Sequence, residues 1–196
     1  MTLNDMLGQV EGSIDLMLGR RDRGWRKLDT TADGFWNSFQ AIPLCIPALL
    51  LTWLSHGRWL IGMGQTEASM GAIALSLAVI ELTGWVLTIL LFFALAGPMN
   101  WRDRIVPTVV AVNWASVAFA YLQAVPAAIG LLIGRGEGVN FVTLVIALIL
   151  LVGYARLLSA AIERPGFVTA GVFVASVALG FLISDFGHSL FGLVNA

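Results

Sequence analysis

Five long apolar stretches constrain this chain more than any other feature of its sequence. A helix needs about 20 apolar residues to cross roughly 30 Å of hydrocarbon. The predicted spans are residues 35–56, 69–97, 105–133, 139–161 and 167–190. Backbone amides in lipid must be satisfied within their own segment, so runs of this length favour helices over strands. The sequence therefore predicts an all-α, polytopic membrane helix bundle with five transmembrane helices.

Composition excludes a water-soluble fold. Of 196 residues, 58% are hydrophobic and only 12% are charged, against about 25% charged in typical soluble proteins. So few charges would not cover a soluble surface, and no basic face for nucleic acid is present. The single cysteine, Cys45, lies inside an apolar stretch, which excludes an intrachain disulfide and a thiolate metal cluster.

The basic residues predict the orientation in the membrane. Nine of the eleven lie on the side of the N-terminus: Arg20, Arg21, Arg23, Arg26, Lys27, Arg102, Arg104, Arg156 and Arg164. Only Arg58 and Arg135 lie on the other side. Lys and Arg are enriched in cytoplasmic loops. We therefore expect a cytoplasmic N-terminus and a C-terminus on the far side of a bacterial cytoplasmic (inner) membrane.

Residues 1–34 form a predicted cytoplasmic segment ahead of the bundle at 35–196. Its apolar residues recur at helical spacing: Leu3, Met6, Leu7, Val10, Ile14 and Met17. This spacing predicts a short amphipathic helix, with Asp5, Glu11 and Asp15 elsewhere on the wheel. The helix would lie on the membrane surface, tethered by the stretch RRDRGWRK, or dock on a partner or on the bundle. The simpler interpretation is that the basic stretch only sets the topology.

Glu81 is the clearest ionisable group within a predicted span. A charge at the centre of a membrane helix costs about 2.5–3.5 kcal/mol, so such residues usually face the bundle interior. The third span carries a polar stripe of Asn113, Ser116 and Gln123 at helical spacing, and we expect these groups to hydrogen-bond Glu81. Two interpretations remain open: a proton or cation step within the bundle, and a neutral carboxyl that holds two helices together.

The two histidines of the chain lie on the same predicted side of the membrane. His188 follows Asp185 by three residues on the fifth span, a spacing that suits a metal or a proton relay. His56 ends the first span. Three interpretations compete: a metal site from His56, Asp185 and His188, a haem held by the two histidines, and ordinary polarity at a helix end. The last is favoured because a metal site needs more ligands, so no cofactor is predicted.

The organisation of the chain resembles the Yip1-type family of small multispanning membrane proteins. The shared features are five spans, a cytoplasmic N-terminal segment, short loops and a far-side C-terminus. The stretch DTTADGFWNSF before the first span also resembles segments of uncharacterised small bacterial membrane proteins. The Asp-Leu-Tyr-Gly-Pro element of eukaryotic members is absent, and only Gly97-Pro98 occurs near a comparable place. The resemblance implies a non-enzymatic scaffold or accessory role, and it transfers no functional residue.

Three functions are compatible with these patterns. No phosphate-binding loop, nucleophile elbow or zinc-protease helix is present in the sequence, so no catalytic residue is predicted. The first hypothesis is a non-enzymatic membrane scaffold or accessory subunit, with a membrane-protein partner or a second copy of itself. The alternative is a small transporter or channel that uses Glu81 with polar residues of the third and fifth spans. The third is a haem or metal subunit that uses His56 and His188.

Overall fold

The computed structural model describes residues 1–193, which form helices and contain no strand. Five helical stretches are long and apolar enough to cross a membrane: Ala32–Gly62, Met70–Ala96, Arg102–Ile133, Glu137–Ile162 and Gly166–Leu190. The predicted all-α bundle of five spans is confirmed, and the chain is an integral membrane protein.

The helices match the predicted spans to within three residues, except at the end of the first, where the helix continues to Gly62 instead of ending at residue 56. Three short elements precede the long helix of the first span: α1 (Leu3–Met17), α2 (Arg21–Trp25) and α3 (Ala32–Asn37). Helix α3 continues through the 3-10 turn η1 (Ser38–Gln40) into α4 (Ala41–Gly62). The predicted border between residues 34 and 35 therefore falls inside a continuous helical run.

The remaining four spans are joined by short connections. They are α5 (Met70–Ala96), α6 (Ile105–Ile133) after the 3-10 turn η2 (Arg102–Arg104), α7 (Glu137–Ile162) and α8 (Gly166–Leu190). Ser69 caps α5, because its side chain accepts a hydrogen bond from the backbone N–H of Ala72. Gly134 ends α6 with a φ of 84°, a conformation that favours glycine.

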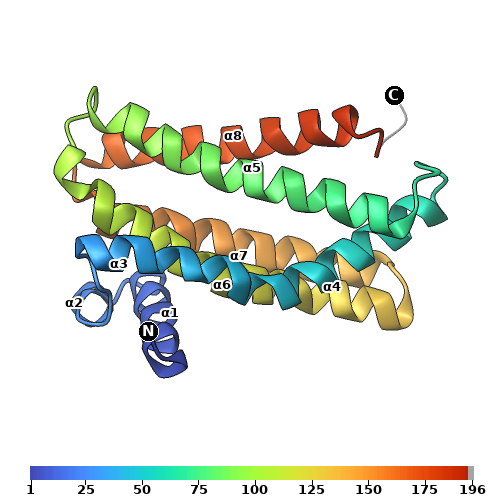
Figure 1. The fold of residues 1–196 in the computed structure, drawn as a ribbon, viewed down its shortest axis with the longest axis horizontal. Helices are drawn as coiled ribbons and strands as arrows, with labels where there is room; N and C mark the ends of the chain where they lie inside the picture. Colours follow the sequence, from blue (N-terminus) through green and yellow to red (C-terminus); the bar gives the residue numbers. More distant parts are fainter. Residues whose placement is uncertain (194–196) are drawn as a thin grey trace.

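The five spans divide into a pair and a trio. Helices α5 and α8 lie along one side of the bundle, and α4, α6 and α7 lie along the other (Figure 1). The trio packs most extensively, around α6. Because the number of spans is odd, the termini lie at opposite ends, here called the N-terminal end and the C-terminal end (Figure 1).

Helix α1 runs across the bundle axis at the N-terminal end (Figure 1). Its second half packs on α6 and α7, where Leu16 is fully buried and Met17 lies over Gly153. Leu3 and Leu7, in its first half, remain exposed. Of the places expected for this amphipathic helix, the bundle itself holds its second half.

Asp15 departs from the expected amphipathic pattern, because it lies on the buried face of α1. Its carboxylate lies 3.0 Å from Lys27 Nζ, 3.1 Å from Arg23 Nε and 3.5 Å from Arg20 Nη1. Basic side chains, rather than a deep apolar core, cover the carboxylate. Part of the basic stretch therefore neutralises a buried acid, a role that the helical wheel did not predict.

Candidate functional site

A cavity of about 600 Å³ lies between the pair and the trio, and residues of all five spans line it. It extends from Ile42 of α4 to His188 near the end of α8. Most of its lining is apolar, with the aromatic side chains of Trp53, Trp85, Phe119 and Tyr154. Its volume lies in the range of small-molecule sites, roughly 300–1,000 Å³.

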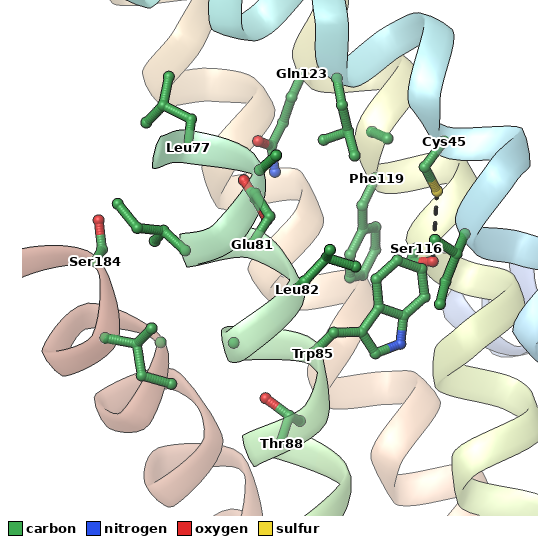
Figure 2. Close-up of a pocket in the computed structure, with 18 of the residues that line it drawn as sticks. Cys45, Leu77, Glu81, Leu82, Trp85, Thr88, Ser116, Phe119, Gln123 and Ser184 are labelled. Carbon is green, nitrogen blue, oxygen red and sulfur yellow. Dashed lines mark hydrogen bonds between the residues drawn. The ribbon is translucent and has the colours of Figure 1, made fainter. Parts of the chain in front are cut away.

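Glu81 lines this cavity near the middle of α5 (Figure 2). Its side chain is exposed to the open space of the cavity, although the walls of the cavity surround it. Among residues 1–193, no side chain forms a hydrogen bond or an ion pair with Glu81. The carboxyl group is therefore free to meet a ligand.

Of the three polar residues predicted on the third span, only Gln123 faces Glu81. Figure 2 shows both side chains pointing into the same space, with no hydrogen bond between them. Ser116 lines the cavity but donates to the backbone oxygen of Asn113 at 2.5 Å, and it contacts Cys45 Sγ at 3.7 Å. The expected hydrogen bonds to Glu81 are absent from the described residues: Asn113 and Ser116 bond to other groups, and Gln123 faces Glu81 without a hydrogen bond to it.

Asn113 is fully buried and joins three elements. Its Nδ2 donates to Ser38 Oγ, and its Oδ1 accepts from Trp85 Nε1, each at 2.8 Å. Ser38 in turn donates to the backbone oxygen of Phe35 at 2.6 Å. Asn113 therefore ties η1 and α5 to α6. The helical spacing predicted a contact with Glu81, but Asn113 does not line the cavity, and its partners come from segments 28 and 75 residues away.

The histidine pair lies at the C-terminal end of the cavity, which His188 lines. His188 lines the cavity, and its Nε2 lies 3.3 Å from His56 Nε2. Its Nδ1 lies 2.6 Å from the backbone oxygen of Ser184. The ring of Trp59 lies 5.7 Å from that of His56, and the Arg135 guanidinium lies 5.3 Å above Trp59.

The metal and haem hypotheses fit this geometry poorly. Asp185 is exposed, and within the described part of the chain no three metal-ligating side chains form a group. The histidine pair alone supplies two ligands, whereas protein metal sites use three or four. An iron with an imidazole on each side, at about 2 Å each, would hold the two nitrogens about 4 Å apart. The observed separation of 3.3 Å leaves too little room.

A second cavity of about 290 Å³ lies among α4, α6 and α7. Its polar lining residues are Thr52, Gln123, Arg135, Asn140 and Thr143. Gln123 lines both cavities and so forms part of the wall between them. The sequence patterns did not predict this cavity, because its polar residues are spread over three segments that only packing brings together.

Comparisons with known proteins return no relative. No protein-family model matches the chain, and no curated protein and no solved structure matches it either. Functional inference therefore rests on the cavity and its side chains.

Proposed function

We propose that this protein binds, and carries across the membrane, a small amphipathic organic cation in its central cavity. The observation that carries the proposal is the position of Glu81, a single unpartnered carboxyl in an otherwise largely apolar cavity. An isolated ionisable group in a membrane span costs about 2.5–3.5 kcal/mol. A bound cation would offset that cost, which gives Glu81 a reason to lie there.

The rest of the cavity lining supports a cationic ligand with an apolar body. None of the lining residues in the described chain is Lys or Arg, so no protein cation competes for Glu81. Trp53 and Trp85 offer aromatic faces, which attract organic cations by about 0.5–2 kcal/mol each. Gln123, Thr88 and Ser184 supply hydrogen-bonding groups that would orient the ligand.

Binding of tetraphenylphosphonium to the purified protein in lipid nanodiscs tests this proposal. We expect Glu81→Gln to weaken binding about tenfold, the loss of one charge pair worth about 1.4 kcal/mol. Glu67→Gln is the matched control, because Glu67 is an exposed carboxyl in the α4–α5 connection. Equal affinity of the wild type and Glu81→Gln would refute the role of Glu81. Uptake of the same cation into proteoliposomes then separates transport from binding alone.

A scaffold or accessory role is the second candidate function. The observation that favours it is the first half of α1, where Leu3 and Leu7 are 62% and 51% exposed beyond the part that packs on the bundle. Such a strip suits a membrane-protein partner or a second copy of the chain. Native mass spectrometry in mild detergent would show an assembly that a Leu3→Ser/Leu7→Ser variant loses. A lone monomer in both cases, with intact cation binding, would favour the transporter.

We also propose that the N-terminal end faces the cytoplasm of a bacterial inner membrane. Nine of the eleven basic residues lie at that end, as the positive-inside rule requires. A Cys45→Ala background removes the single, buried cysteine. Single cysteines placed at Thr2 and at Glu67 would then react with an impermeant maleimide in intact spheroplasts only at Glu67. Labelling at Thr2 alone would reverse the orientation.

A further inference from the structure

The histidine pair is joined by a hydrogen bond that defines where its protons lie. A carbonyl oxygen only accepts, so His188 must donate its Nδ1–H to the backbone oxygen of Ser184 at 2.6 Å. When His188 is neutral, its Nε2 therefore carries a lone pair. At 3.3 Å from that lone pair, His56 Nε2 must carry the hydrogen of the bond. His56 Nδ1 then holds the only free lone pair of the two rings.

We infer that His56 and His188 form a one-proton binding site at the C-terminal end of the central cavity, and that this proton opposes cation binding at Glu81. A proton from water adds to Nδ1 of His56 and forms an imidazolium. Its Nε2–H continues to donate to His188, so the bond between α4 and α8 stays intact. A second proton would need His188 Nε2, the acceptor of the bond, and would place two cations 3.3 Å apart.

In the described part of the chain, no charged side chain around the pair neutralises an added proton. Arg135, from the connection between α6 and α7, lies over the Trp59 ring that in turn contacts His56. Glu81 of α5 and His188 line the same cavity, so a charge on the pair would interact with the Glu81 carboxyl across that cavity. On the pair's own helices, Arg58 and Asp185 are exposed. No described side chain ion-pairs with either histidine.

Competition between the proton and the ligand follows from this arrangement. His188 lines the largely apolar cavity that would hold an organic cation at Glu81, so a positive charge on the histidine pair would repel that cation where charges are weakly screened. Coupling between two binding sites is reciprocal. The bound proton must therefore lower the affinity for the cation by the same factor as the bound cation lowers the affinity for the proton. Release of the cation on one side and uptake of a proton on the other would constitute an exchange. This step rests on the proposed function, whereas the proton site itself does not.

Nitrogen NMR of the 15N-histidine-labelled protein in nanodiscs tests the proton site without any ligand. At about pH 8 we expect the Nδ1–H tautomer on His188 and the Nε2–H tautomer on His56. On acidification to about pH 4, one shared proton step should shift the signals of both rings. His56→Gln and His188→Gln should each remove the shared step, and Asp185→Asn, an exposed acid on the same turn of α8, should not. Independent titration of the two rings, or the opposite tautomers, would overturn the inference.

Cation binding at two pH values tests the competition. Tetraphenylphosphonium should bind the wild type about fivefold more weakly at about pH 4 than at about pH 8. The His56→Gln and His188→Gln variants should each lose this difference. A pH-independent affinity in the wild type would overturn the competition. If the NMR signature is present but Glu81→Gln binds the cation normally, the proposed function fails and the proton site stands. If Glu81→Gln abolishes binding while the rings titrate independently, the reverse holds.

Discussion

At the N-terminal end of the bundle, the carboxylate of Asp15 lies within 3.5 Å of three basic side chains, whereas Glu81, in the central cavity, has no hydrogen-bond or ion-pair partner among residues 1–193. The amides differ in the same way. Both polar atoms of the Asn113 side chain form hydrogen bonds, whereas the Gln123 side chain forms none among the described residues. In both comparisons, the group with partners holds elements together, and the group without a partner borders the cavity. The comparison separates the structural polar residues of this bundle from those available to a ligand.

The largest expected effect compares how tightly the N-terminal end and the cavity wall are packed. A Cβ at Gly34 would overlap the backbone oxygen of Asp29, which cannot move away as a side-chain tip would. Gly34→Ala should therefore destabilise the protein by about 3 kcal/mol. Gly84 lines the cavity, and a Cβ added there would meet open space, so Gly84→Ala should change stability by less than about 0.5 kcal/mol. Unfolding in SDS titrations measures both, and equal losses would break the contrast.

A second comparison uses two amides on the same helix. Asn113→Leu would leave Trp85 Nε1 and Ser38 Oγ without their partner, and we expect it to cost about 2 kcal/mol of unfolding free energy. Gln123→Leu removes an amide that has no partner among the described residues and should cost less than about 0.5 kcal/mol. The same variant should alter cation affinity, because Gln123 faces Glu81 across the cavity. A loss for Gln123→Leu above this value would show that the polar groups of the cavity also contribute to the stability of the fold.

The smallest effect concerns acid sensitivity at the N-terminal end. Burial alone would raise the pKa of the Asp15 carboxyl, but the Lys27 hydrogen bond and the charge of Arg23 outweigh it and hold that pKa below its usual value. A lowered folded-state pKa contributes stability above the unfolded pKa, and this is lost as pH falls through the folded value. The hydrogen-exchange protection factors of α1 and α2 should therefore fall below about pH 4.

Asp15→Asn is the control for this acid response. It should accelerate exchange in α1 and α2 already at neutral pH and reduce the further change on acidification. Some acid response should remain, because the Asp29 carboxyl also has a lowered pKa, through its hydrogen bonds with Thr31. An acid response identical to that of the wild type would show that Asp15 does not secure this end.

Much of the fold follows from short-range patterns. The apolar runs predict α5 to α8 to within a few residues, because hydrocarbon thickness sets the length of each span. The predicted first span already includes FWNSFQ from residue 35, but the same patterns do not predict that the helical run begins earlier, at Ala32. The helical period predicts α1 and the burial of Val10 and Met17, but it does not predict that Asp15 is buried beside them and paired with basic side chains.

The sequence alone determined that Glu81 lies near the centre of a membrane span and that the two histidines end on one side of the bilayer, because hydropathy and helix length fix the depth of each residue. Only the tertiary structure decided that Asn113 forms hydrogen bonds with Trp85 and Ser38. It also decided that Glu81 faces a cavity of about 600 Å³ and that the Nε2 atoms of His56 and His188 lie 3.3 Å apart. These partners lie on different helices. The rotation and spacing of packed helices set such contacts, and neither follows from a helical period within one segment.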